Sequence, residues 1–170
     1  MPIDPGDFKQ GMRRLGASVC IITTRRPDGS RNGLTATAVC SLSAEPPMLL
    51  ACLNRSSNSF GPVVEAGVFA VNVLSLQDAA TADQFAGARP AAEKFLVGDW
   101  GEGPTGAPIL TTALAAFDCQ VDKVVEAGTH GILLGLVHHV MLGDAAKAPL
   151  LYAAGAYGGF SAELAELLVS

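Results

Sequence analysis

Two short polar runs, each at the end of an apolar segment, hold the side chains best suited to binding a ligand. Residues 35–38 read TATA, and residues 54–59 read NRSSNS. The second run joins an expected strand to an expected helix, where unpaired backbone N–H groups face outward. Its guanidinium and hydroxyls, with a helix N-terminus, would form a phosphate site. An ordinary helix cap would need only one of those hydroxyls, and alternating threonines are common on exposed sheet faces.

The histidines differ in their suitability for a site. His130 lies in the segment GTHGI, where glycines beside a strand start leave the side chain free to project over a cleft. It could equally be an ordinary strand residue. His138 and His139 are adjacent on an expected strand, so they point to opposite faces and cannot easily chelate a metal together. No cysteine or carboxylate cluster accompanies them, and the sequence therefore predicts no metal site.

One segment matches a nucleotide-binding pattern in its sequence but not in its expected secondary structure. Residues 101–106, GEGPTG, have the spacing Gly-x-Gly-x-x-Gly. That pattern binds a pyrophosphate only when a strand precedes it and a helix follows it. Pro104 and Pro108 forbid the helix and no strand is expected before it, so we predict a loop over residues 98–108. The chain also has no Walker A loop and no Gly-x-Ser-x-Gly nucleophile elbow.

Length and composition indicate one globular domain, 1–170, that associates with a partner. Hydrophobic residues make up 49% of the 170 and charged residues only 16%, which favours burial of surface in an oligomer. The net charge of −5 argues against nucleic acid or an anionic membrane as the main partner. No export signal or membrane span is expected. The cysteines lie in apolar segments, which predicts buried, reduced thiols in a cytoplasmic protein: Cys20, Cys40, Cys52 and Cys119.

Hydrophobic periodicity predicts a mainly β protein with peripheral helices. Strands are expected over residues 18–24, 32–43, 48–54, 68–74, 114–128, 129–143 and 149–157. Short helices are expected over residues 5–16, 56–67, 77–87 and 161–169. A turn at residues 27–29 would join the first two strands into a hairpin over 18–43. Because the helices do not alternate regularly with the strands, a closed or partly closed antiparallel barrel is favoured over a doubly wound sheet.

Four segments of the chain resemble a known family in their order and spacing. Residues 32–60, 67–87, 128–137 and 149–157 are similar to the short-chain flavin reductases, the small components of two-component flavin-dependent monooxygenases. The similarity extends from about residue 8 to residue 160. It implies the FMN-binding split barrel, an antiparallel Greek-key fold, and a homodimer.

The resemblance also implies roles for particular residues. The flavin would lie along Thr35, Ala36, Thr37, Ala38, Ser41, Cys52, Asn54 and Arg55, with its phosphate near Arg55, Ser57 and Ser59. Phe60 and Phe85 would cover part of the pocket. His130, Tyr152 and Tyr157 would border the nicotinamide. This chain has Thr129 where relatives commonly have aspartate, and it lacks the arginine that relatives often carry between the two tyrosines.

The expected function is an NAD(P)H-dependent flavin reductase. Hydride would pass from NADH or NADPH to FMN or FAD, and the reduced flavin would go to a separate monooxygenase. No protein acid or base is needed for this step, because the cofactor carries the chemistry. The alternatives are a flavin-storage protein without turnover, a reductase of another acceptor such as a corrinoid, and a split-barrel oxidase of a pyridoxine-like substrate. The last would need more basic residues than the 11 present.

Overall fold

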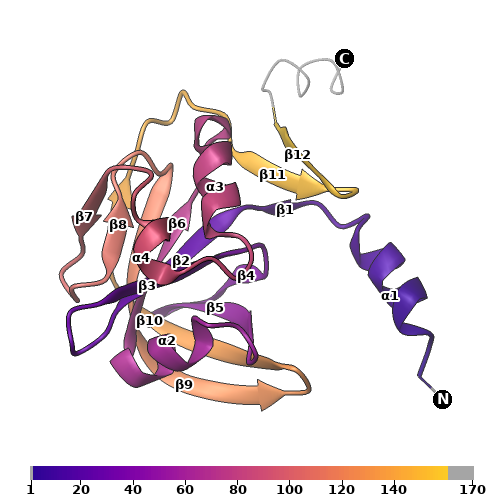
Figure 1. Cartoon of the computed structure of the whole chain (residues 1–170), viewed down its shortest axis with the longest axis horizontal. Coiled ribbons are helices and arrows are strands. Elements are labelled where there is room, and N and C mark those ends of the chain that lie inside the picture. The colour runs from indigo at the N-terminus through magenta and orange to yellow at the C-terminus, as the bar shows by residue number, and fades with distance from the viewer. Residues whose placement is uncertain (1, 161–170) are drawn as a thin grey trace.

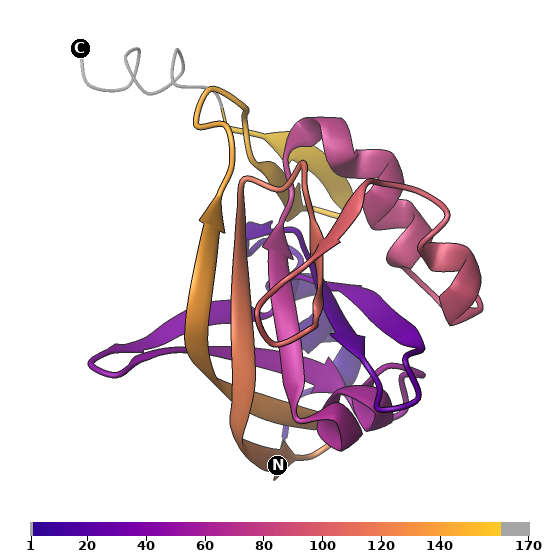
Figure 2. The same ribbon diagram turned by 90° about the vertical axis from the view of Figure 1, so that its left-hand side faces the viewer.

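The computed structural model describes residues 2–160, and seven of its strands form one antiparallel sheet. The strand order is β3-β2-β6-β9-β10-β5-β4. β3 and β4 stand at opposite edges of this sheet, yet only Thr37 and Ala38 separate them in the chain. The sheet must therefore curl back on itself, as Figures 1 and 2 show. The strands are β2 Cys20–Arg25, β3 Arg31–Ala36, β4 Val39–Ala44, β5 Pro47–Asn54, β6 Val68–Val73, β9 Ala115–Ala127 and β10 His130–Leu142.

The interior of the curled sheet is apolar because its strands turn alternate residues inward. Along β5, Leu49, Ala51 and Leu53 are buried, whereas the residues between them are partly exposed. The ring of Phe69, on β6, is fully buried in the same cluster. It packs against Gly135, where an added Cβ would come within 2.5 Å of the ring.

Helices and two small sheets surround the barrel. The helical segments are α1 Pro5–Met12, α2 Phe60–Ala66, the 3-10 turn η1 Leu76–Asp78, α3 Ala79–Phe85 and α4 Ala91–Lys94. One small sheet joins β1 Ala17–Ser18, β11 Leu150–Ala153 and β12 Ala156–Gly159, and the other joins β7 Trp100–Glu102 and β8 Pro108–Leu110. α3 and α4 pack on β3, while α1 stands away from the barrel (Figure 1). The predicted mainly β fold with peripheral helices is confirmed.

The boundaries of several predicted elements are wrong. The strand expected over residues 32–43 breaks at Thr37–Ala38, because β3 pairs with β2 whereas β4 pairs with β5. The loop expected over residues 98–108 contains β7, which pairs with β8, and GEGPTG gives its first two residues to β7 and the rest to the turn. The last predicted strand is a hairpin of β11 and β12, which turns at Ala154 and Gly155 with positive φ. The helix expected over residues 161–169 lies outside the described residues.

The cysteines are free, as predicted, but they are not all buried. Cys20 and Cys119 are buried in the core, and burial raises the pKa of each thiol to about 12. Cys52 is partly exposed, and Cys40 is exposed because it lies on the edge strand β4, most of which faces outward. Among residues 2–160, no helix has the length and apolar character needed to cross a membrane.

Candidate functional site

The segment between β5 and α2 is a turn, not the start of a helix. Asn54 accepts two hydrogen bonds with its side-chain oxygen, from the backbone N–H and from the hydroxyl of Ser56, both at 2.9 Å. Ser57 Oγ accepts a hydrogen bond from the N–H of Phe60, at 3.2 Å. These local bonds compete with the helix, which therefore begins at Phe60. The predicted helix N-terminus at Ser56 is wrong, and we call residues 55–59 the serine loop.

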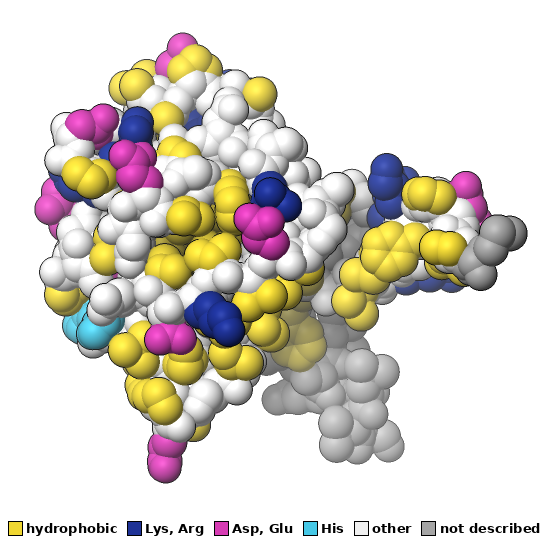
Figure 3. All heavy atoms as spheres, turned by 90° about the horizontal axis from the view of Figure 1, so that it is seen from below, with side chains coloured by type: hydrophobic (Ala, Val, Ile, Leu, Met, Phe, Trp, Pro, Cys, Tyr) yellow, Lys and Arg dark blue, Asp and Glu magenta, His cyan; other side chains and the backbone are white. Residues whose placement is uncertain are grey.

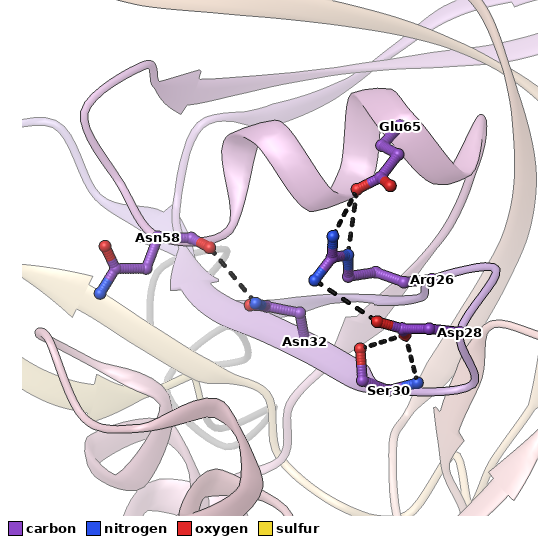
Figure 4. A network of polar contacts seen from close by, with 6 residues as sticks. All are labelled: Arg26, Asp28, Ser30, Asn32, Asn58 and Glu65. Carbon is purple, nitrogen blue, oxygen red and sulfur yellow. Dashed lines mark hydrogen bonds and ion pairs between the residues drawn. The ribbon is translucent and has the colours of Figure 1, made fainter.

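The β2–β3 hairpin supports the serine loop and the following helix α2 (Figure 4). Asn32 Nδ2 donates to the backbone oxygen of Asn58 at 3.2 Å, and Ser59 Oγ donates to Asn32 Oδ1 at 2.6 Å. Arg26 forms an ion pair with Glu65 of α2 at 2.9 Å. The Ser59 hydroxyl is buried and already has protein acceptors, so it holds the loop in place.

Next to the serine loop is a cavity of about 340 Å³, which we call the serine cavity. Four of the residues that line it are predicted site residues: Thr35, Ser57, Ser59 and Phe85. Thr35 Oγ1 donates to the Ala82 carbonyl at 2.6 Å, and Phe85 is fully buried against Phe95 and Trp100. The lining residues are Leu34, Thr35, Ser56, Ser57, Asn58, Ser59, Phe85, Gly87, Ala88 and Lys94.

A larger cavity, of about 830 Å³, opens where β5 and β9 end and β10 begins, and we call it the histidine cleft. His130 pairs with Asn54 across the sheet, and its Nδ1 lies 2.9 Å from Thr129 Oγ1. Arg55 forms an ion pair with Glu126 at 3.0 Å, and both side chains are substantially exposed. The lining residues are Lys9, Asn54, Arg55, Ser56, Phe60, Glu126, Gly128, Thr129 and His130.

Phe60 can line the histidine cleft because its ring packs against Gly131, which has no side chain. A Cβ added to Gly131 would lie 2.3 Å from Phe60 Cε2 and 2.6 Å from Phe60 Cζ. Ring and strand can approach this closely only because position 131 has no side chain. The glycine after His130 therefore has a packing role that the sequence alone did not reveal.

A third cavity, of about 420 Å³, separates α1 from residues 37 and 38, where the chain passes from β3 to β4. We call it the helix cleft. Thr37, Ala38 and Tyr152 line it, together with Phe8, Lys9, Met12, Arg13, Leu15 and Ala17. The rings of Tyr152 and Tyr157 meet edge to face, with their centroids 5.7 Å apart. Burial, followed by the nearby Asp83 carboxylate, raises the pKa of Tyr157.

The predicted site residues thus divide among three neighbouring cavities. Ser56 lines both the serine cavity and the histidine cleft, and Lys9 lines both the histidine cleft and the helix cleft. His130 and Tyr152, which the resemblance placed at one opening, line different cavities of the described chain. Four other predicted residues line none of these three cavities within residues 2–160: Ala36, Ser41, Cys52 and Tyr157.

Sequence reasoning missed Lys94, a cation that lines the serine cavity. Of the adjacent histidines, His138 has its Nε2 3.1 Å from Gln120 Oε1. In the described part of the chain, no group of three or more His, Cys, Asp or Glu side chains could hold a metal ion.

The curled antiparallel barrel with cavities at its rim agrees with the split-barrel fold that the resemblance implied. The model of the flavin reductase like domain matches residues 12–161, and the chain therefore belongs to this family. The resemblance seen in the sequence is confirmed, as is the antiparallel split-barrel fold.

Individual relatives agree with this assignment. The chain is 45% identical over 152 residues to a protein of Variovorax paradoxus named FMN reductase (NADH) RutF, covering 89% of this chain and 83% of that protein. The NADH:FAD oxidoreductase SgcE6 of Streptomyces globisporus, solved with NAD and FAD fragments, superposes with a TM-score of 0.85 at 26% identity, covering 95% and 97%. BorF, the flavin reductase component of a bacterial two-component tryptophan halogenase, gives a TM-score of 0.85 at 28% identity, covering 92% and 98%.

Proposed function

We propose that this chain reduces FMN with NADH and supplies the reduced flavin to a separate flavin-dependent monooxygenase. The observation that carries the proposal is the grouping of the serine loop, Phe60 and His130 in adjoining cavities of a flavin reductase like fold. The relatives named FMN reductase (NADH) support FMN and NADH as the pair of substrates.

The residues present fit a phosphorylated flavin. The serine cavity offers the hydroxyl proton of Ser57, whose oxygen only accepts a bond from Phe60, beside the buried cation of Lys94, and both groups suit a phosphate. The adjoining histidine cleft contributes the Phe60 ring and the Arg55 guanidinium. When bound, the flavin supplies a ring that accepts hydride, so the protein need only bind and orient its ligands. We assign flavin contacts to Thr35, Ala36, Thr37, Ala38, Ser41, Cys52, Asn54, Arg55, Ser57, Phe60 and Phe85, while Ser59 holds the serine loop in place through Asn32 and Gly33.

His130 is the residue we assign to the nicotinamide. Thr129 Oγ1 lies 2.9 Å from His130 Nδ1, and this contact leaves Nε2 available at the cleft. A histidine here can hydrogen-bond the carboxamide or ribose and hold the reacting carbon close to its acceptor, but it cannot itself take the hydride. Tyr152 and Tyr157 are proposed to border the same ligand from the small sheet.

A second copy of the chain is the partner we propose for α1. This helix has no buried residue, and Phe8, Met12 and Leu15 are exposed by 57%, 49% and 65%. Figure 3 shows hydrophobic side chains on the projecting helix and on the adjacent face of the body. A helix that exposes an apolar face is stable only when that face is covered. The paired subunit would close the helix cleft over Thr37 and Tyr152.

Light scattering after size exclusion should give the mass of a dimer for the wild type. Replacing both Phe8 and Met12 with glutamate should shift the protein towards the monomer, because charges would replace the exposed apolar face. Ala145→Glu is a matched control, since Ala145 is exposed in a turn remote from α1. A wild-type protein that is monomeric at all concentrations would contradict the homodimer.

Initial rates of NADH and NADPH oxidation, with FMN or FAD added, test the reaction itself. We expect NADH with FMN to give the highest kcat/KM of the four combinations. The flavin-storage alternative is favoured by Thr129 and by the missing arginine between Tyr152 and Tyr157. It would be correct if the protein bound flavin and oxidised neither nucleotide.

Free cysteines are consistent with the cytoplasm, which we propose as the location.

A further inference from the structure

Glu126 places a carboxylate in a cleft that is proposed to receive anionic ligands. It lies on β9 opposite Gly131, the residue that follows His130 on β10, and it lines the histidine cleft. Its Oε2 lies 3.0 Å from Nη1 of Arg55. FMN and NADH both carry phosphates, which a carboxylate repels. Neither the binding of the flavin nor the positioning of the nicotinamide gives Glu126 a task.

The histidine cleft has three charged side chains in its lining, Lys9, Arg55 and Glu126, beside the titratable His130. Lys9 belongs to α1 and forms no ion pair within residues 2–160. It can attract the pyrophosphate, which NADH and NADPH share. Arg55 is already engaged by Glu126, but both side chains are substantially exposed, at 43% and 63%, so a ligand can rearrange the pair.

NADH and NADPH differ by one phosphate on the adenosine 2′ oxygen. In doubly wound dinucleotide-binding folds, an acidic side chain accepts a hydrogen bond from the 2′-hydroxyl of NAD, whereas an arginine accommodates the 2′-phosphate of NADP. The same chemistry applies to any fold, because a phosphate monoester carries a charge of about −1.5 to −2 at pH 7 and needs a cation. The histidine cleft contains both residue types, but the carboxylate of Glu126 neutralises the guanidinium of Arg55. This arrangement favours the hydroxyl over the phosphate.

We propose that Glu126 makes the protein select NADH over NADPH. This inference rests on the proposed function and adds to it the residue that decides between the two dinucleotides. The histidine cleft, at about 830 Å³, is large enough to receive ribose groups as well as the nicotinamide. Glu126 accepts a hydrogen bond from a ribose hydroxyl of NADH and keeps Arg55 from a 2′-phosphate. NADPH would have to displace Glu126 from Arg55 and leave a free carboxylate beside its phosphate.

Steady-state rates with NADH and with NADPH, both at saturating FMN, test the proposal. The wild type should have the higher kcat/KM with NADH, and Glu126→Gln should lower the NADH-to-NADPH ratio of kcat/KM about 10-fold. The change should come chiefly from a lower KM for NADPH, because the charge acts on binding. A change in flavin affinity cancels in this ratio. A wild type that prefers NADPH, or an unchanged ratio in Glu126→Gln, would overturn the proposal.

Asp122→Asn is the matched control. Asp122 is exposed on the same strand, four positions before Glu126, and it lines none of the three cavities within residues 2–160. The control removes the same charge and should leave the ratio unchanged. If it lowered the ratio as much as Glu126→Gln does, the net charge of the protein would set the preference, and the proposal would be wrong.

Arg55→Ala tests the role of the ion pair. In an Arg55→Ala background, Glu126→Gln has no guanidinium to release, so its effect on the NADH-to-NADPH ratio should be smaller than in the wild type. Equal effects in the two backgrounds would contradict the statement that Glu126 keeps Arg55 from the 2′-phosphate.

Titrations with the oxidised dinucleotides separate this inference from the proposed function, because they need no turnover. Glu126→Gln should tighten the binding of NADP⁺ relative to NAD⁺ by a similar factor. If the wild type oxidises neither NADH nor NADPH, yet this affinity ratio shifts, the selection by Glu126 stands and the reductase function is rejected. If the wild type oxidises NADH and neither ratio shifts in Glu126→Gln, the reductase function stands and the selection by Glu126 is rejected.

Discussion

Replacing His130 with alanine should lower kcat/KM for NADH roughly 10- to 100-fold, while FMN binding stays nearly unchanged. The imidazole lies in the histidine cleft, and the contact between its Nδ1 and Thr129 fixes its orientation. Its loss would leave the nicotinamide free to adopt unproductive positions, which slows the reaction without touching the serine cavity. Steady-state kinetics and flavin titration on the same preparations measure the two quantities.

His139→Ala is the matched control for this experiment. His139 is exposed on the same strand, β10, but it lies nine positions further along and lines none of the three cavities within residues 2–160. Its removal should change neither the kinetics nor the binding. If His130→Ala also behaves like the wild type in both assays, the nicotinamide binds elsewhere. Weaker FMN binding in His130→Ala would instead place the flavin against the imidazole.

The strands of the barrel were predictable because each has a strong and uninterrupted pattern. Residues 48–54 and 68–74 are continuous apolar runs bounded by turn residues, and they became β5 and β6 almost unchanged. A helix was expected to end at Gly67 and two strands to meet at Gly128, and both glycines adopt positive φ at those ends. The break at Thr37–Ala38 was not predictable, because it arises from the curling of the sheet and not from a breaking residue.

The polar residues of the site were partly predictable from their sequence neighbours. Arg55, Ser57 and His130 stand in short segments of distinctive composition, and all three line adjoining cavities. Lys94 gave no such indication, because a single lysine in a short charged segment is normally exposed. Its burial results from contacts with backbone oxygens 61 and 9 residues earlier in the chain, which no local pattern encodes.

Gly131→Ala should both destabilise the protein and impair its turnover. The new methyl group would lie 2.3 Å from the Phe60 ring, so ring or strand must shift. Overpacking of this kind costs about 1–3 kcal/mol of unfolding free energy. Because Phe60 lines the histidine cleft, a displaced ring would also lower kcat/KM for NADH. Denaturant unfolding and steady-state kinetics measure the two effects.

A second substitution shows whether the ring is the cause. If the methyl group acts through Phe60, Gly131→Ala should be less harmful to stability in a Phe60→Leu background, with a coupling energy of about 0.5–3 kcal/mol. Gly61→Ala is the control, because an added Cβ at Gly61 meets nothing within 4 Å, and alanine is the better helix former at this position in α2. It should leave the protein as stable as the wild type or slightly more so. Additive effects of Gly131→Ala and Phe60→Leu would show that the methyl group is accommodated without the ring, and the close contact would then have no role in shaping the cleft.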